Sequence, residues 1–241
     1  MKTSTKTIFS ILFLATFLSS CNVNMFNQIN GNRNVVTENR KVKEDFTKIK
    51  VSTGLDLYIT QGSSTEITVE ADENLQDIII TEVNKGVLKV YSEKNIWKAK
   101  SRKVYVTLET LEGISATSGS DVYTKGTLKV NDISVSSTSG ADIRMSLDAN
   151  SVTSSATSGS DIEISGTANN HDSSATSGAS IDAYDLRSKN VTVRVTSGAD
   201  INIYASEKLD AKATSGGDID FKGNPKQVNK KSSSGGDVSK R

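Results

Sequence analysis

The sequence predicts an all-β fold: a single-stranded, right-handed parallel β-helix with coils of about 19 residues, preceded by a more irregular β segment. Two observations lead to this prediction. A Thr-Ser-Gly-x-Asp-Ile pattern recurs seven times in the second half of the chain, and small or apolar residues alternate with polar ones on both sides of each glycine. A fixed period of this length is typical of stacked repeats, and alternation with a period of two is typical of strands.

The composition supports a slim fold and narrows the chemistry. Only 5% of the 241 residues are aromatic, whereas 17 residues are glycine, so we expect a thin core. The 29 basic and 28 acidic residues nearly cancel, which argues against a nucleic-acid-binding protein with a broad basic surface. A single His and a single Cys exclude zinc sites rich in those residues.

Residues 1–20 have the features of a lipoprotein signal peptide. Lys2 and Lys6 precede an apolar run over residues 8–18, which is about half the length that a membrane-spanning helix needs. The Leu-Ser-Ser-Cys sequence that ends at Cys21 resembles a bacterial lipobox, which implies cleavage before Cys21 and acylation of its sulfur. The alternative is an ordinary secretory signal followed by an incidental cysteine.

Residues 21–40 are rich in Asn, and their few apolar residues are scattered, so we expect a polar tether between lipid and folded body. Removal of the signal peptide leaves 27 basic and 28 acidic residues, a formal charge of −1. Acyl chains rather than a polybasic patch are therefore expected to hold the protein to the membrane. Asn22 stands where an Asp would favour inner-membrane retention, so the outer membrane is the expected location.

Residues 41–110 form the irregular β segment. Residues 51–59 align on Gly54 with the later repeats and indicate a degenerate first coil. The interval from Gly54 to Gly119 is not a multiple of the repeat, so irregular coils or an inserted hairpin must fill it. Asn84-Lys85-Gly86 suits the turn of such a hairpin.

Residues 111–241 form the regular β-helix. Its seven coils are centred on glycines that recur at a nearly constant interval: Gly119, Gly140, Gly159, Gly178, Gly198, Gly216 and Gly235. Three residues after each glycine stands an Ile or Val that we expect to point inward. Each glycine should turn a corner, where the chain needs a positive φ or lacks room for a side chain. The Ser and Thr before the glycines suit hydroxyl hydrogen bonds to turn amides and along the stack.

These features together resemble a known family. The lipobox, residues 46–51 leading into Gly54, the turn at 84–86 and the Ser-Gly-x-Asp ladder look like the autotransporter-adhesin head GIN domain family over about residues 40–241. The resemblance implies a β-helical protein of a kind common in Bacteroidetes, whose biochemical function is unknown. It therefore implies a fold rather than an activity.

The main candidate site is a column of carboxylates two residues after the glycines, interrupted by Ser180: Asp121, Asp142, Asp161, Asp200, Asp218 and Asp237. Carboxylates on successive coils would lie about 5 Å apart and repel one another. Turn amides or nearby lysines could offset this repulsion. The functional interpretation is a ladder that binds a ligand or a cation such as Ca²⁺, which takes carboxylate and carbonyl oxygens.

A polysaccharide-cleaving enzyme is the alternative function. Many pectin-degrading enzymes are right-handed β-helices, and two carboxylates about 5 to 9 Å apart suit a glycosidase. An active site should interrupt the repeat with an added acid, base or sugar-stacking aromatic residue. Ser180 instead removes a carboxylate, and we expect no aromatic cluster along the column. No residue is therefore assigned a catalytic role.

His171 and Trp97 are each the sole residue of their type. His171 lies in a polar stretch, residues 169–172, and is predicted to be a turn residue; no Gly-x-Ser-x-Gly elbow supports a Ser-His-Asp triad. Trp97 is expected to pack into the core. The alternative is an exposed contact for a glycan or a partner, flanked by Lys94, Lys98, Lys100, Arg102 and Lys103.

We therefore expect a lipid-anchored binding, adhesion or structural module of the cell envelope. Its expected partners are the membrane, through the acylated Cys21, and a cell-surface glycan or protein at the strand faces. No cofactor is expected beyond Ca²⁺. The last coil ends at Arg241 without an obvious cap, so a second subunit could cover it, while nearby cations would limit aggregation: Lys230, Lys231, Lys240 and Arg241.

Overall fold

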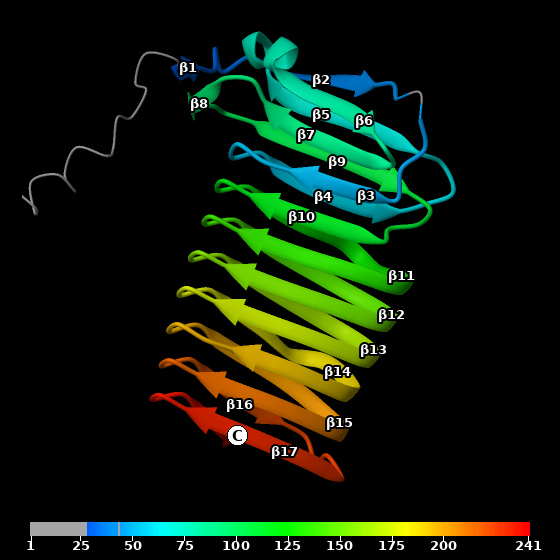
Figure 1. Ribbon diagram of the computed structural model, residues 1–241. Helices are drawn as coiled ribbons and strands as arrows, with labels where there is room; N and C mark the ends of the chain where they lie inside the picture. The colour runs from blue at the N-terminus through cyan, green and yellow to red at the C-terminus, as the bar shows by residue number, and fades with distance from the viewer. Residues whose placement is uncertain (1–27, 43) are drawn as a thin grey trace, which may run out of the picture.

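The computed structural model describes residues 28–42 and 44–241, most of which lie in β-strands (Figure 1). The predicted signal peptide, Cys21 and the first residues of the predicted tether lie outside the described residues. The strands stack along one axis, with the irregular segment at one end and the C-terminal coil at the other. The predicted parallel β-helix is therefore confirmed.

The irregular segment holds strands of three to seven residues and one short 3₁₀ helix: β1 (Gln28–Asn30), β2 (Val35–Arg40), β3 (Lys48–Val51), β4 (Asp56–Gln61), β5 (Glu66–Asp72), η2 (Glu73–Ile78), β6 (Ile79–Asn84), β7 (Val87–Ser92), β8 (Asn95–Lys98) and β9 (Arg102–Leu108). In the regular coils, β11 to β15 are long strands of 15 to 18 residues, whereas the strands at either end are short. The strands are β10 (Gly113–Thr117), β11 (Asp121–Thr138), β12 (Asp142–Thr157), β13 (Asp161–Thr176), β14 (Ser180–Val195), β15 (Asp200–Thr214), β16 (Asp218–Lys222), β17 (Gln227–Ser233) and β18 (Asp237–Lys240).

The regular coils pair in parallel with equivalent residues opposite one another. Asp142 lies opposite Asp161, and Ile143 lies opposite Ile162. The isoleucines of this column point inward, with exposed fractions of 1% at Ile143 and Ile162. A slip of one residue would turn every isoleucine to solvent, so burial of this column fixes the register.

Each corner has two residues with left-handed backbone conformations. In the fourth coil φ is 58° at Ser177 and 68° at Gly178. A Cβ at Gly178 would meet nothing within 4 Å, so conformation and not space requires the glycine. The Gly178 amide donates to the Ser197 carbonyl of the next coil, whereas the Thr176 and Ser177 hydroxyls lie 3.4 Å apart within one coil. The prediction that these hydroxyls bond along the stack is wrong, because the backbone makes that bond.

The Gly54 segment is part of the stack. Strand β4 pairs in parallel with β11, which places Asp56 opposite Asp121, and Thr53 and Gly54 have the same positive φ as the later corners. On the far side, β7 pairs with β3 and β9 pairs with β4, so the chain forms one more coil there. The antiparallel pairs β5–β9 and β6–β7 fill the irregular interval, and the second turns at Lys85 and Gly86.

The prediction that residues 21–40 form a tether is wrong for the part that the structure describes, residues 28–40. Strand β1 pairs in parallel with β8, and β2 pairs antiparallel with β5 at the N-terminal end of the stack. Strand β2 is largely exposed, so backbone pairing rather than apolar alternation holds it in place. Ile29 of β1 packs against the core, which shows that one scattered apolar residue can fix a short strand.

The two ends of the stack differ. At the N-terminal end, η2 buries Leu75 completely. At the C-terminal end every residue of β17 is exposed, and β18 lies at the edge of the sheet. Covering of this end by a second subunit stays a prediction.

Candidate functional site

The predicted carboxylate column lies on one outward face of the solenoid. Asp121, Asp142 and Asp161 are direct neighbours on β11 to β13, and Asp200, Asp218 and Asp237 are neighbours on β15, β16 and β18. Ser180 separates the two groups, as the sequence requires. Two residues further along the same face stand Glu163, Asp182 and Asp220. We call the following carboxylates the acidic face: Asp142, Asp161, Glu163, Asp182, Asp200, Asp218 and Asp220.

Neighbouring charges within this column are not fully offset. Burial and the negative charges of Asp56 and Asp142 raise the pKa of Asp121, and the opposite effect of two arginines offsets only part of this rise. Burial and the negative charges of Asp218 and Asp220 raise the pKa of Asp200. Both shifts mean that the folded protein disfavours the ionised carboxylate at these positions.

A hollow of about 200 Å³ lies where Ser180 interrupts the column, between Asp142, Arg144, Asp161 and Glu163. Arg144 forms an ion pair with Glu163 at 3.2 Å across its rim. Among residues 28–42 and 44–241, no three His, Cys, Asp or Glu side chains converge in a way that could hold a metal ion.

A stack of tyrosines adjoins the N-terminal end of the column, against expectation. The ring of Tyr58 lies between those of Tyr105 and Tyr123, with centroid distances of 5.1 and 5.3 Å. Tyr58 and Tyr123 each stand four residues after a corner glycine, so alignment of the copies could have placed them together. Tyr105 could not be placed this way, because it belongs to β9, which carries no Ser-Gly pattern.

Most faces of these rings are already in contact with other side chains. Tyr58 has a ring on each side, and the Arg144 guanidinium lies 5.8 Å from the centroid of Tyr123. Lys125 Nζ lies 4.6 Å from the centroid of Tyr105 and 5.6 Å from that of Tyr58. A sugar stacks on an open aromatic face, so this cluster offers little surface for stacking. Beside it, burial raises the pKa of Asp56, although Arg102 and Lys103 act in the opposite direction.

His171 is inside the solenoid, so the prediction of a turn residue is wrong. It lies within β13, where alternation places it inward with 2% exposure. Its Nε2 and the Ser154 hydroxyl are 2.9 Å apart, and Ser154 donates to Ser173 at 2.9 Å. Burial lowers the pKa of His171 to about 4, so it is neutral at physiological pH. The neighbouring Asp172 faces outward, 3.4 Å from Arg194, and forms no triad with His171.

Trp97 is 61% exposed, so the prediction that it packs into the core is wrong. Alternation along β8 explains the result, because Ile96 occupies the inward position with 5% exposure and Trp97 must then point out. Trp97 borders a groove of about 660 Å³ whose charged lining residues are Arg33, Lys98 and Arg102. We call Trp97 and these three cations the Trp97 patch.

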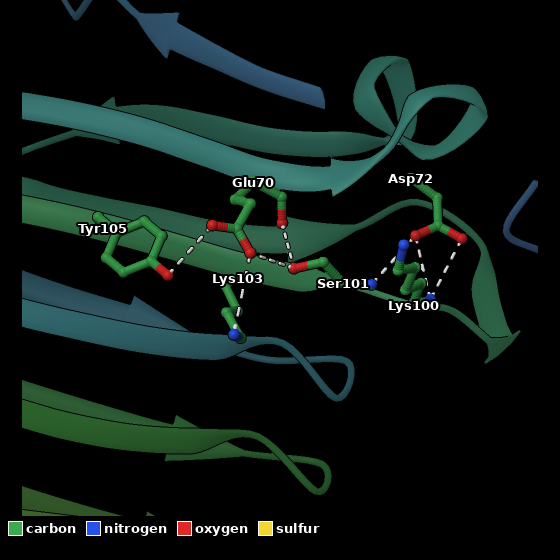
Figure 2. Close-up of polar contacts among 6 residues, drawn as sticks. All are labelled: Glu70, Asp72, Lys100, Ser101, Lys103 and Tyr105. Carbon is green, nitrogen blue, oxygen red and sulfur yellow. Dashed lines mark hydrogen bonds and ion pairs between the residues drawn. The ribbon is translucent and has the colours of Figure 1, made fainter. Parts of the chain in front are cut away.

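The buried carboxylate of Asp72 fixes the backbone around this patch (Figure 2). It accepts hydrogen bonds from the backbone amides of Arg33 at 2.9 Å and of Lys100 and Ser101 at 3.0 Å. Burial by itself raises the pKa of Asp72, but the three amides outweigh it and the net shift is downward. Asp72 therefore joins the loop between β1 and β2, residues 31–34, to the loop between β8 and β9, residues 99–101.

Glu70 links the same loop to the tyrosine stack (Figure 2). The Ser101 hydroxyl lies 2.8 Å from the Glu70 carboxylate, Lys103 Nζ lies 3.8 Å away, and the Tyr105 hydroxyl donates at 3.4 Å. Figure 2 shows these side chains side by side along β5 and β9. The loop that follows Trp97 is thus tied to the body of the solenoid at two carboxylates.

A family model described as "Putative auto-transporter adhesin, head GIN domain" matches residues 45–225. The chain belongs to this family. The resemblance seen in the sequence is therefore confirmed, and the match spans the Gly54 coil and most of the regular coils. No curated protein sequence matches the chain.

Several solved structures share the fold. A "putative adhesin" from Bacteroides fragilis has a TM-score of 0.80 at 24% identity, over 88% of this chain and 100% of its own. A "putative lipid binding protein" from Parabacteroides distasonis has a TM-score of 0.73 at 22% identity, over 89% and 99%. A "putative adhesin" from Parabacteroides merdae has a TM-score of 0.70 at 20% identity, over 89% and 99%. At these identities the likeness establishes the architecture alone.

Within the part of this head GIN domain protein that the structure describes, no helix has the length and apolar character needed to span a bilayer. Its outward surfaces instead differ in charge from one end to the other. The cationic Trp97 patch lies in the irregular segment, and the acidic face runs along the regular coils.

Proposed function

We propose that the protein is a lipid-anchored, non-catalytic binding module of the cell envelope, held at the outer membrane through acylated Cys21, whose acidic face contacts the partner. Membership of a family named for adhesins supports surface binding as the general role. Relatives described as adhesins and as a lipid binding protein support it further.

One observation carries the choice of the acidic face. Its carboxylates stand in register on successive coils, as in the pairs Asp142–Asp161 and Asp200–Asp218. Burial raises the pKa of Asp200, and the negative charges of Asp218 and Asp220 raise it further. Repulsion of this kind is relieved when opposite charges approach, so the face favours a cationic partner. The partner chemistry that fits is a basic segment of a cell-surface protein or a glycan with free amino groups.

Polysaccharide cleavage is the less favoured function. Asp56 and Asp121 are paired carboxylates with raised pKa values beside tyrosines, which is the kind of interruption that an active site needs. The covered ring faces argue against a sugar stacked there, so we assign no catalytic residue.

Binding is tested with the purified chain against immobilised cationic peptides, amino-group glycans and acidic polysaccharides, each with Ca²⁺ or with a chelator. We expect binding to the cationic ligands that weakens with salt and is lost in the triple variant Asp161→Asn, Asp200→Asn, Asp218→Asn. The matched control carries Asp132→Asn, Asp148→Asn and Asp185→Asn, three exposed carboxylates outside the acidic face. Equal loss in both variants contradicts a specific face, and binding that requires Ca²⁺ supports the cation ladder instead.

Two further measurements test the alternative function and the lipid anchor. New reducing ends or unsaturated products, lost in Asp121→Asn, would establish cleavage. Metabolic labelling with a radioactive fatty acid should mark the wild-type protein and not Cys21→Ala. An unlabelled wild type would remove the lipid anchor from the proposal while leaving the acidic face to be judged by the binding panel.

A further inference from the structure

The exposed position of Trp97 is unusual within the described chain. Large apolar side chains are otherwise buried there, and Val228 at 47% exposure is the other marked exception. Trp97 stands on a paired strand, because β8 pairs with β1, and its neighbour Ile96 is buried. A large apolar ring held outward in this way is suited to a surface contact.

The charges around the ring have one sign. The groove beside Trp97 is lined by Arg33, Lys98 and Arg102, and no carboxylate is among its lining residues. Two acidic side chains lie against residues 32–34 beside the groove and are already bonded: Asp72 accepts three backbone amides, and Glu73 accepts the side-chain amides of Asn32 and Asn34. The Trp97 patch therefore favours an anionic partner.

The position of the patch in the chain limits which anionic partner can reach it. Strand β1 starts at Gln28, seven residues after Cys21, and seven residues span at most about 25 Å. Figure 1 shows β1 and β8 side by side at the N-terminal end of the stack, remote from the C-terminal coil. A lipid on Cys21 would hold the start of β1 within that distance of a bilayer, and the Trp97 patch lies beside β1.

We propose that the Trp97 patch is a membrane-contact surface that docks on anionic phospholipid, with the Trp97 ring at the level of the headgroups and Arg33 and Lys98 against their phosphates. Tryptophan is enriched at membrane interfaces because its ring is apolar and its N–H is polar. Each Lys or Arg near an anionic surface adds attraction. This inference rests on the proposed lipid anchor for its biological setting, but its chemistry is independent of the acyl chains.

The experiment uses the chain from residue 22 onward, which lacks the acylated cysteine and retains every residue that the structure describes. Trp97 is the only tryptophan, so the emission spectrum reports its surroundings alone. Vesicles of phosphatidylcholine mixed with phosphatidylglycerol should shift the emission to the blue and sediment the protein. Vesicles of phosphatidylcholine alone should do neither, and high salt should release the protein.

The test variant carries Lys98→Gln and Arg33→Asn. Asn is chosen because Arg33 has a φ of 66°, a region that Asn tolerates better than most residues. Loss of two cations should weaken vesicle binding about 30-fold. The matched control carries Lys226→Gln and Lys231→Gln, which remove the same charge at the C-terminal end and should bind as the wild type does. Trp97→Ala should sediment less than the wild type at equal lipid.

Several results would overturn the proposal. Equal losses in the two double variants would show a general effect of charge. An equal emission shift with uncharged vesicles would remove the role of the cations. Emission that is already blue in buffer and unchanged by lipid would mean that residues 22–27 of the chain cover the ring, and a shift with soluble glycans but not vesicles would make the patch a sugar site. Failure of fatty-acid labelling bears on the anchor alone and leaves these readouts intact.

Discussion

The irregular segment and the regular coils are stabilised in different ways. In the regular coils a column of equivalent residues recurs, so Ile143, Ile162 and their neighbours perform the same task at each level. In the irregular segment single contacts act once, and the clearest is Asp72 with its three amides. The comparison shows that repetition spreads stability over many similar residues, whereas an irregular end depends on a few.

Each region also buries a titratable group, and the two groups respond to acid in different ranges. His171 in the regular coils has a pKa lowered to about 4 by burial. Asp72 in the irregular segment has a pKa below its usual value of 3.8 because backbone amides donate to it. Both groups favour folding at neutral pH, and acid should therefore weaken the regular coils first.

The largest effect should come from removing Asp72. Asp72→Ala leaves the amides of Arg33, Lys100 and Ser101 without their acceptor and opens a small space, which should lower the free energy of unfolding by about 3 kcal/mol. The same substitution at exposed Asp161 in the regular coils should change it by less than about 0.5 kcal/mol. Urea unfolding of both variants tests the contrast, and equal losses would contradict it.

The second prediction concerns pH. The pKa of His171 is about 4 in the folded protein and 6.5 in the unfolded chain. Between these two pH values the unfolded chain therefore binds a proton at His171 that the folded protein does not. Stability is complete above pH 6.5 and should fall by about 3 kcal/mol as the pH drops toward 4. His171→Val, which matches the neighbouring Val152 and Val191, should remove this slope. Thermal melts of both proteins from pH 7 to pH 4 measure it; parallel curves would show that His171 does not control acid sensitivity.

The third prediction compares two glycines. A Cβ at Gly31 would lie 1.9 Å from Asp72 Oδ2, so Gly31→Ala should destabilise the protein by about 2 kcal/mol through displacement of that carboxylate. Gly178→Ala meets no atom within 4 Å and should cost about 1 kcal/mol, the cost of a left-handed backbone alone. The midpoints of urea unfolding should rank in this order. The reverse order would mean that strain at the corners outweighs the contacts of the irregular segment.

The smallest effect should be a gain in stability. Asp200→Asn removes repulsion with Asp218 and Asp220 and should raise stability at pH 7 by about 0.3 kcal/mol, because the group is exposed and screened. The gain should vanish at pH 3, where the carboxyl is protonated, and at high salt. Any gain from Asp56→Asn should persist at high salt, since burial and not repulsion raises the pKa of Asp56, while Arg102 and Lys103 attract its charge. A comparison of melting temperatures at two salt concentrations distinguishes the two positions.

The regular coils were predictable because each position occurs several times. The isoleucine column, the corner glycines and the carboxylate column all follow from alignment of the copies, and Gly54 could be added because its neighbours match. A residue type that occurs once, such as His171, has no identical residue at the same position in the other copies. His171 was predicted to lie in a turn because its neighbours are polar, yet its position aligns with Val152 and Val191, and this alignment could have placed it inside.

The irregular segment was less predictable for a physical reason. Trp97 faces outward because Ile96 occupies the only inward position on a four-residue strand. The sequence alone does not show which of these two side chains is buried. Residues 28–40 form strands through pairing with partners far along the chain, β5 and β8. The position of Tyr105 in the tyrosine stack likewise depends on the pairing of β9 with β4. Such long-range pairings leave no local period to detect.

Because the coils stack in parallel register, the length of the solenoid is proportional to the number of repeat copies. Each copy of the repeat adds about 4.8 Å along the axis, and seven copies span about 34 Å. If the N-terminal end rests on the membrane, the number of copies sets how far the C-terminal tip reaches from it. A tandem duplication of one coil would move that tip outward by one step and leave both the Trp97 patch and the last coil unchanged.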